Sequence, residues 1–185
     1  MKLDITKEHA FSDIQKYLSP LRQFNEEKAR KGMLDDWDEA KHTSDWIKRI
    51  LKSIQDGGND RLTVYYWEEK GSIIGVAFAL INSESIRTTL AKDGVFPDVE
   101  SPTLAHLTGF HILESHRGQG RGSSWLTTEI LPDLRAKGVQ QLYIRSSHYR
   151  ALSLYEKLGT KVGNYISVSD SKLYKRYGYI YRIDL

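Results

Sequence analysis

Three glycines at alternate positions follow a segment that predicts a strand, 104–113, and open a segment, 118–137, that predicts a helix. The stretch reads His116-Arg117-Gly118-Gln119-Gly120-Arg121-Gly122-Ser123-Ser124. Glycines have no Cβ atom, so their backbone N–H groups can converge on one point, and the start of a helix favours an anion. Arg117 and Arg121 add positive charge, and Ser123 can donate a hydroxyl. The pattern predicts a turn that binds a pyrophosphate.

The glycine spacing decides which kind of phosphate-binding turn this is. A P-loop needs a Lys directly after its last glycine, and Ser123 stands there. A dinucleotide-binding turn needs a different spacing and an acid after the next strand, where residues 145–147 read Arg-Ser-Ser. Both motifs are therefore excluded. A glycine-rich turn without a ligand remains an alternative.

Apolar runs and apolar residues at helical spacing predict the other elements. We expect strands over 3–5, 62–67, 72–81, 104–113, 141–145, 161–168 and 177–183, and helices over 7–18, 21–32, 43–54, 118–137 and 149–158. The order predicts a mixed α/β fold with one sheet. Its strand–helix–strand unit over 104–145 should form a right-handed parallel crossover.

Prolines and capping residues predict the element boundaries. Pro20 should end the first helix, and Pro132 should kink or divide the helix over 118–137. The segment 82–103 is predicted to be a loop with one helical turn near 86–90. Predicted N-caps are Thr43 or Ser44 for the helix over 43–54, and Ser146 or Ser147 for that over 149–158.

Composition narrows the classes of function. The absence of Cys excludes disulfides, Cys-containing metal sites and a Cys nucleophile. The first hundred residues carry 15 Lys and Arg against 18 Asp and Glu, whereas residues 101–185 carry 12 against 6. A basic second half favours an anionic ligand. The N-terminal residues lack the pattern of a secretory leader and no apolar run could span a membrane, so we expect a cytoplasmic protein.

Two segments together resemble the acyl-CoA motifs of the GCN5-related N-acetyltransferases (GNAT). Arg117-x-x-Gly120-x-Gly122, after a strand and before a helix, is similar to the family's cosubstrate turn. Residues 151–159, Ala-Leu-Ser-Leu-Tyr-Glu-Lys-Leu-Gly, are similar to its A-x-x-L-Y-E-K-x-G-F helix. The resemblance covers residues 104–159.

The resemblance implies a single GNAT domain over 1–185, with a central, mostly antiparallel sheet, one parallel crossover and helices on both faces. The acyl-CoA-binding core would be 104–159, and the acceptor-site elements 20–60 and 160–185. The implied reaction moves an acetyl group from acetyl-CoA to a primary amine of a small molecule or peptide. The amine would attack directly in a ternary complex, without a covalent acyl-enzyme and without a metal.

The resemblance also implies the cosubstrate-binding residues. They are Ile112, Leu113, Arg117, Gly118, Gln119, Gly120, Arg121, Gly122, Ser123 and His148. Backbone groups of Ile112 and Leu113 would pair with the pantetheine amides. His148 stands where the family often has Asn, Thr160 where it prefers Phe, and Glu114 where it often has Pro.

Tyr155 is the implied general acid that stabilises the departing thiolate of CoA. The alternative is a core tyrosine on the inward stripe of its helix. The attacking amine must be neutral, so a proton acceptor is needed. His106, on the strand that leads into the turn, is the first candidate, and His111, Glu114 and water remain open.

Two regions could receive the acceptor. Asp35, Asp36, Asp38 and Glu39 surround Trp37 and could attract a cationic amine, although a solvated acidic loop is the favoured explanation. The C-terminal tyrosines could form the wall of an acceptor pocket. They are Tyr165, Tyr174, Tyr177, Tyr179 and Tyr181. The last three alternate along the sequence, and one face of a strand explains them more simply.

Two other functions compete with the transferase. A non-catalytic acyl-CoA-binding domain would have the same motifs, and only product formation would separate the two. A nucleic-acid-binding protein would fit the basic half, but its basic residues are not interleaved with aromatics as in a known RNA motif. His106, His111 and His116 are five apart, which matches no metal-binding spacing. We expect no membrane partner and a homodimer.

Overall fold

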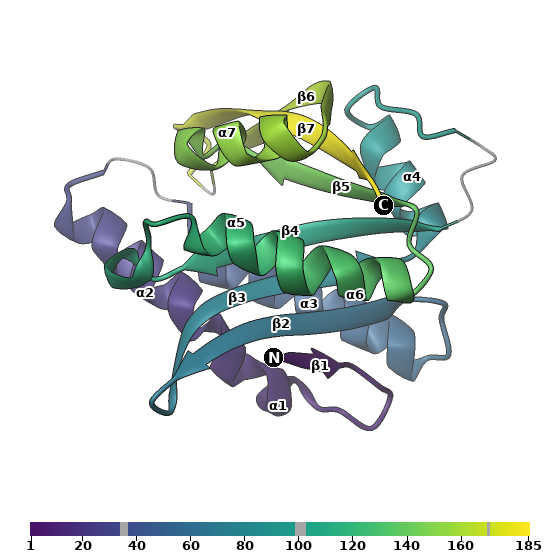
Figure 1. The fold of residues 1–185 in the computed structure, drawn as a ribbon, viewed down its shortest axis with the longest axis horizontal. Coiled ribbons are helices and arrows are strands. Elements are labelled where there is room, and N and C mark those ends of the chain that lie inside the picture. The colour runs from purple at the N-terminus through teal and green to yellow at the C-terminus, as the bar shows by residue number, and fades with distance from the viewer. Residues whose placement is uncertain (34–36, 99–102, 170) are drawn as a thin grey trace. The chain divides into compact units, whose positions relative to one another are not determined.

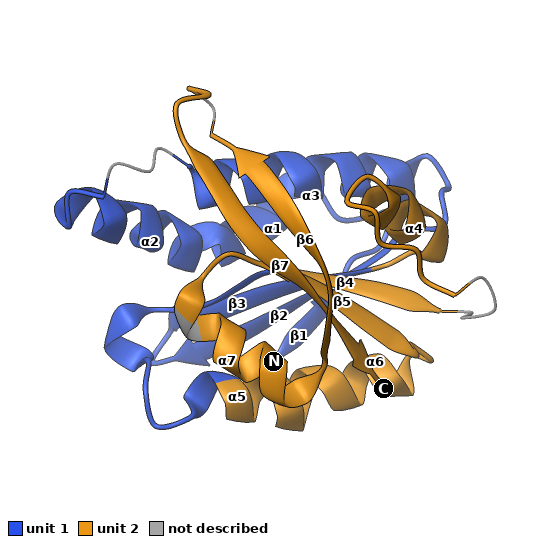
Figure 2. Cartoon of the chain, turned by 90° about the horizontal axis from the view of Figure 1, so that it is seen from above, with its two compact units in different colours: residues 1–80, 108–122 blue, residues 81–107, 123–185 orange. Residues whose placement is uncertain are grey.

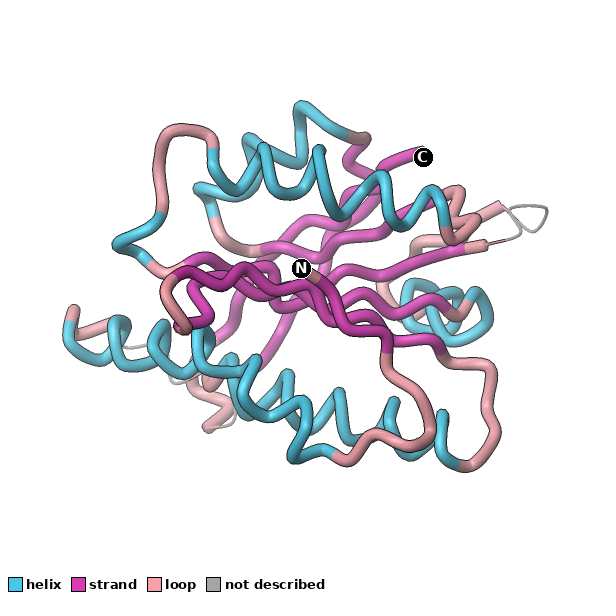
Figure 3. The backbone as a smooth tube through the Cα atoms, turned by 60° about the horizontal axis from the view of Figure 1, so that its bottom comes forward, coloured by secondary structure: helices cyan, strands magenta, loops and turns pink. Residues whose placement is uncertain are grey.

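The computed structural model describes residues 1–33, 37–98, 103–169 and 171–185, and helices and strands follow one another along them (Figures 1 and 3). The strands are β1 (Lys2–Asp4), β2 (Arg61–Glu69), β3 (Ser72–Ile81), β4 (Leu104–Ile112), β5 (Gln141–Ser146), β6 (Thr160–Val168) and β7 (Lys175–Asp184). The α-helices are α1 (Phe11–Gln15), α2 (Ser19–Arg30), α3 (Glu39–Gln55), α4 (Ser83–Ala91), α5 (Arg121–Trp125), α6 (Leu131–Ala136) and α7 (Tyr149–Leu158).

The strands follow the order β1-β2-β3-β4-β5-β7-β6 in one sheet. β1 pairs with β2, β5 with β7 and β6 with β7 in antiparallel fashion, while β4 and β5 are parallel. This confirms the predicted mixed α/β fold with a mostly antiparallel sheet and one parallel crossover.

The chain divides into two compact units (Figure 2). Unit 1 comprises residues 1–80 and 108–122, and unit 2 comprises 81–107 and 123–185. The boundary passes through β4 and directly after the glycine turn. The single domain over 1–185 therefore stays a prediction, and each unit is described by itself.

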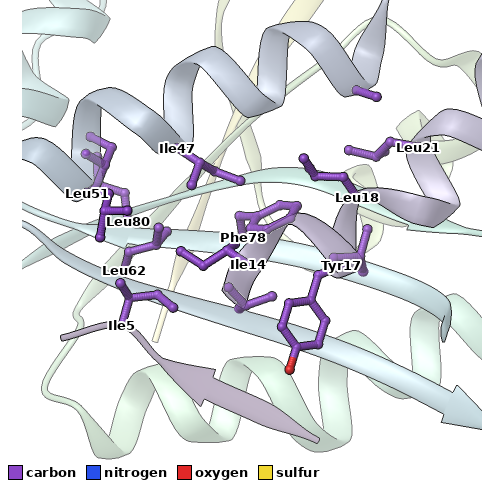
Figure 4. Packing of buried hydrophobic residues seen from close by; sticks show 14 residues of the cluster. Ile5, Ile14, Tyr17, Leu18, Leu21, Ile47, Leu51, Leu62, Phe78 and Leu80 are labelled. Atoms are coloured by element: carbon purple, nitrogen blue, oxygen red, sulfur yellow. The ribbon is translucent and has the colours of Figure 1, made fainter. Parts of the chain in front are cut away.

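The core of unit 1 forms between helices α1 to α3 and strands β2 and β3. Phe78 of β3, Ile14 of α1 and Ile47 of α3 are each fully buried and lie together (Figure 4). The helical spacing of Ile47, Ile50 and Leu51 puts all three on the buried side of α3. Leu21 belongs to the same cluster, so this core also includes the first turn of α2.

Gly109 gives β4 an irregular backbone inside unit 1. Its φ is +61°, a left-handed conformation that a strand residue with a side chain avoids. A Cβ atom there would lie 2.9 Å from Cδ2 of Phe78. Only glycine fits both the conformation and the space, so strict alternation of side chains does not carry through β4 to His111.

Unit 2 contains the parallel pair and a second core. The register joins 104–107 of β4 to 141–144 of β5, with His106 opposite Tyr143. Leu104, Tyr143 and Ile180 are buried together with apolar residues of α4 and the loop after it. In this unit β4 contributes only its first four residues.

Two predictions about the N-terminal helices were wrong. Pro20 does not end a helix but lies in the first turn of α2, where its missing N–H would have no helical partner anyway. α3 begins at Glu39, four residues before the predicted start. Asp38 is the N-cap, and its carboxylate accepts from the Lys41 amide at 2.8 Å, while Thr43 is buried inside the helix.

Two later boundaries also differ. The predicted loop 82–103 contains the two-turn helix α4, because the Asn82 side chain caps it by accepting from the Glu84 and Ser85 amides. The N-cap of α7 is His148 rather than a serine, and Ser146 Oγ accepts from its amide at 3.3 Å. Gly159 ends α7 as predicted.

Pro132 divides its helix as predicted. A π-helical segment, Leu126–Ile130, lies between α5 and α6, and Pro132 occupies the first turn of α6. Proline has no N–H and its ring crowds the preceding turn, so a wider turn accommodates it.

Over the described residues, no helix is long and apolar enough to cross a membrane.

Candidate functional site

The glycine turn in unit 1 has a left-handed backbone. Gly118, Gln119 and Gly120 have φ of +100°, +53° and +71° in succession. A Cβ atom at Gly118 or Gly120 would meet nothing within 4 Å, so conformation rather than crowding calls for glycine there. The turn is exposed and leads into α5 at Arg121. An open turn of this kind can present backbone N–H groups to an anion.

The two arginines of the turn behave differently. Arg117 lies against its own unit: Nε donates to the Ile112 carbonyl at 2.6 Å, and Nη2 lies 2.8 Å from Nε2 of His111. Glu27 of α2 is 3.9 Å from the same Nη2. Arg121 is exposed, and among the described residues it has no ion-pair or hydrogen-bond partner for its guanidinium.

Backbone groups predicted for pantetheine are already bonded in part. The Leu113 amide donates to the Ile74 carbonyl at 2.8 Å, and the Ile112 carbonyl accepts from Arg117. Ile112 and Leu113 are both buried, at 7% and 8% exposure respectively. The Leu113 carbonyl also accepts, from the His116 amide at 2.9 Å. The role of the two residues in cosubstrate binding stays a prediction, restricted to the Ile112 amide or to a second lone pair of either carbonyl.

Tyr155 of α7 is buried in unit 2, at 3% exposure. Its ring centroid lies 5.7 Å from that of Tyr181. Over the described part of the chain, its hydroxyl makes no hydrogen bond. Burial, and then nearby Tyr165, raise the pKa of this phenol. A buried phenol ordinarily finds a hydrogen-bond partner. Among the residues that the structure describes, the protonated Tyr155 hydroxyl has no such acceptor.

His106 of β4 is half-buried in unit 2, and its ring likewise makes no hydrogen bond within the described ranges. Burial, with the positive charge of Arg145, lowers its pKa to about 4. The imidazole is therefore neutral at pH 7 and has a lone pair. A neutral imidazole can accept a proton, although a pKa this low makes it a weak base.

The other candidate bases are engaged in unit 1. His111 Nε2 faces the Arg117 guanidinium, which only donates, so this nitrogen is the acceptor and the proton resides on Nδ1. The Glu114 carboxylate lies 2.5 Å from Lys31 Nζ. Either group would have to give up its contact before taking a proton at that atom.

The two remaining predicted contacts to CoA lie in unit 2. His148 is exposed, and its ring stacks on that of Tyr149 with centroids 5.7 Å apart. Ser123 is half-buried, and its carbonyl accepts from the Thr127 hydroxyl at 2.9 Å. Both stay predictions as cosubstrate contacts.

The acidic segment around Trp37 has structural roles where it is described. Asp38 caps α3 and accepts from the Asn25 side-chain amide at 2.7 Å. The Trp37 ring stacks on His42, with centroids 4.0 Å apart. Asp35 and Asp36 lie outside the described residues. Glu39 is the first residue of α3.

The C-terminal tyrosines have unequal environments. Tyr177 is 70% exposed, whereas Tyr181 is fully buried, and its hydroxyl donates to Glu156 at 3.3 Å. Tyr179 lies under the Lys161 ammonium, 3.6 Å from its ring centroid. Tyr174 is half-buried. A common wall for an acceptor pocket stays a prediction.

Sequence reasoning missed a charged group beside the second core. Arg145 of β5 pairs with Asp93 at 3.1 Å, and its guanidinium lies 4.3 Å from the Tyr165 ring centroid. Its Nε is buried without a hydrogen-bond partner among the described residues. The spacing of positions 93, 145 and 165 in the sequence does not predict this group. Only the fold brings the three together.

Metal ligands are not grouped in the described ranges, which contain no cluster of three or more His, Cys, Asp or Glu side chains able to hold an ion. His106 belongs to unit 2, and His111 and His116 to unit 1. The three histidines at five-residue spacing therefore do not all belong to one unit.

The mixed sheet, the parallel pair of β4 and β5 and the left-handed glycine turn agree with the fold that the GNAT resemblance implies. The family model described as the acetyltransferase (GNAT) family matches residues 23–160. The chain therefore belongs to the acetyltransferase (GNAT) family, and this membership implies acyltransferase activity. No curated protein is similar enough in sequence to show a closer relationship.

Solved structures of acetyltransferases share the fold. Arabidopsis thaliana NAA60 in complex with acetyl-CoA is 14% identical with a TM-score of 0.57, covering 100% of this chain and 98% of that one. The structure of the same protein in complex with a bisubstrate analogue is 14% identical with a TM-score of 0.54, covering 100% of this chain and 98% of that one. The ribosomal-protein-alanine N-acetyltransferase from Brucella melitensis is 16% identical with a TM-score of 0.52, covering 99% of each chain.

Proposed function

We propose that this protein is an N-acetyltransferase that moves the acetyl group of acetyl-CoA to a primary amine of a small molecule or peptide. The observation that carries the proposal is the left-handed turn at Gly118–Gly120 within a chain of the GNAT family. The turn binds the pyrophosphate through its backbone N–H groups, and the exposed Arg121 side chain adds a positive charge. Solved relatives of the same fold were crystallised with acetyl-CoA or a bisubstrate analogue, which supports the choice of cosubstrate.

The chemistry needs a donor for the departing sulfur. Attack of the neutral amine on the thioester carbonyl forms the C–N bond, and collapse breaks the C–S bond and releases the thiolate of CoA. The Tyr155 hydroxyl donates a hydrogen bond to that sulfur. Its burial, its missing partner within the described residues and its raised pKa support a group that stays protonated until the thiolate forms.

The amine must also lose a proton. His106 is neutral at pH 7, so its lone pair can accept from the amine through a water molecule and release the proton to solvent. His111 and Glu114 are weaker candidates, because Arg117 and Lys31 occupy them. With no Cys in the chain, direct transfer is favoured over an acyl-enzyme.

An amine panel tests the proposal. Polyamines, amino acids, aminoglycosides and peptides with free N-termini are incubated with acetyl-CoA, and free thiol is followed together with acetylated product. Saturable, stoichiometric release of thiol and product with at least one amine is the expected result. Binding of acetyl-CoA without product from any amine would instead favour a non-catalytic acyl-CoA-binding domain.

A further inference from the structure

Arg117 and Arg121 stand four residues apart in the same turn, yet their side chains have different environments. The Arg121 side chain is exposed and, over the described ranges, without a partner. The Arg117 side chain is 27% exposed and makes contacts on several sides within unit 1. A residue that neutralises a phosphate should resemble Arg121. Arg117 is placed for a different task.

The contacts of Arg117 join the end of β4. Its Nε donates to the Ile112 carbonyl at 2.6 Å, and its Nη2 donates to His111 Nε2 at 2.8 Å. The planar guanidinium can satisfy both acceptors at once because its N–H groups diverge in a fixed fork. A lysine has a single ammonium and cannot hold the two positions in the same way.

The same guanidinium also reaches α2. Glu27 is 3.9 Å from Nη2, and its side chain is only 12% exposed, which limits solvent screening. The Phe24 ring lies 5.8 Å from the Arg117 guanidinium carbon and 4.6 Å from the His111 ring. Phe24 and Glu27 are three residues apart and therefore share one face of α2. Arg117 thus connects the turn to one face of this helix.

We propose that Arg117 is a positioning residue that couples the cosubstrate-binding turn to helix α2 through His111, Phe24 and Glu27. When the turn binds the pyrophosphate, Arg117 holds the end of β4 and the face of α2 that carries Phe24 and Glu27 in one arrangement. Since 20–60 is the expected acceptor region, binding of acetyl-CoA would prepare that region for the amine. This inference rests on the proposed function, because it takes acetyl-CoA as the ligand of the turn.

Hydrogen exchange tests the coupling without knowledge of the acceptor. Amide exchange over residues 19–30 is measured for the full chain with and without saturating acetyl-CoA. For the unmodified protein we expect acetyl-CoA to slow exchange in α2 by about fivefold or more, a coupling of the usual size between sites. In Arg117→Gln, measured at an acetyl-CoA concentration that saturates this variant, the slowing in α2 should disappear.

Matched variants separate the fork from the charge. Arg117→Lys keeps the positive charge and loses the fork, so it should behave as Arg117→Gln in the exchange experiment. Arg121→Gln should keep the slowing in α2, while its acetyl-CoA dissociation constant becomes less sensitive to salt. Glu27→Gln keeps the shape of the side chain and should also reduce the slowing in α2. This variant provides the test if the Arg117 variants do not fold.

The outcomes distinguish this inference from the proposed function. No binding of acetyl-CoA to the unmodified protein would remove the proposed function. Binding with equal slowing of α2 exchange in the unmodified protein, Arg117→Lys and Glu27→Gln would overturn the coupling and leave the proposed function intact. A salt dependence lost in Arg117→Gln and kept in Arg121→Gln would also contradict it, since Arg117 would then be the phosphate ligand.

Discussion

Apart from the exposed Arg121, the two compact units differ in how they hold their polar candidate side chains. In unit 1, Arg117, His111 and Glu114 are each bonded to another group of the same unit. In unit 2, the buried hydroxyl of Tyr155 and the ring of His106 make no hydrogen bond among the described residues. The protein itself therefore supplies the partners of these three side chains in unit 1. For the two side chains of unit 2, the proposed function assigns the substrate as the partner.

The largest expected effect breaks the rigid side of this comparison. Gly109→Ala should lower the free energy of unfolding by about 2–5 kcal/mol, since a left-handed φ costs about 1–2 kcal/mol and contact with Phe78 adds a core clash. Gly71→Ala is the control, because its φ is +76° but a Cβ there meets nothing. Gly71→Ala should lower the free energy of unfolding only by the cost of the left-handed φ. Equal losses in denaturant titrations would show that Phe78 does not confine Gly109.

The next effect concerns His106 and pH. Its pKa is about 4 in the folded protein and about 6.5 in the unfolded chain, so the unfolded state holds more protons between these values. The free energy of unfolding should therefore fall as pH drops from 6.5 to 4, with His106 accounting for up to about 3 kcal/mol.

Denaturant titrations of the protein and of His106→Gln across this range isolate the contribution. The variant should show a shallower decline below pH 6.5. Parallel curves for the two proteins would mean that His106 titrates normally and is not a neutral group at acidic pH.

Tyr155→Phe tests the unpaired side of the comparison. With no hydrogen bond to lose within the described residues, the variant should change the free energy of unfolding by less than about 0.5 kcal/mol. Loss of the donor should lower kcat by roughly a hundredfold. Tyr143→Phe is the matched control, because the hydroxyl of buried Tyr143 donates to Gln141 at 3.1 Å.

The control should lose about 1 kcal/mol of stability and keep its kcat. Thermal unfolding and thiol release measured side by side give both numbers. A Tyr155→Phe variant with full activity and reduced stability would make Tyr155 a core residue.

The smallest effect sharpens the acceptor region of unit 1. Asp38→Ala removes the cap of α3 and should cost about 1 kcal/mol of stability. Because the carboxylate is bonded to Lys41 and Asn25, we expect the KM for a cationic amine to change less than about twofold. A tenfold rise in KM at unchanged stability would return Asp38 to the role of attracting the amine.

The sequence predicted those parts of the fold that depend on local patterns. The glycine turn, the division at Pro132 and the end of α7 at Gly159 follow from residues whose backbone preferences act locally. The predictions at Pro20 and Thr43 were wrong because the same residue types suit both a helix start and a helix interior or end. Tertiary packing, here the burial of Thr43 and the cap at Asp38, decides between them.

The residues proposed for the site come from local motifs, whereas their contacts do not. The motifs locate the glycine turn and propose Tyr155, because their spacing is local, and the roles of these residues stay predictions. The partners of Arg117 come from α2 and β4, about 90 and 5 residues earlier in the chain. Likewise, the lowered pKa of His106 depends on Arg145 and on burial. No sequence spacing encodes such partners, so the assignment of Arg117 as an internally bonded residue required the structure.

The central claim is that the turn of unit 1 binds acetyl-CoA. Calorimetric titration of the protein with acetyl-CoA, with ATP and NAD as controls, tests it most directly. The account predicts a dissociation constant in the micromolar range for acetyl-CoA, and little heat with either control. An absence of heat with millimolar acetyl-CoA would contradict it, and the basic second half of the chain would then need another anion.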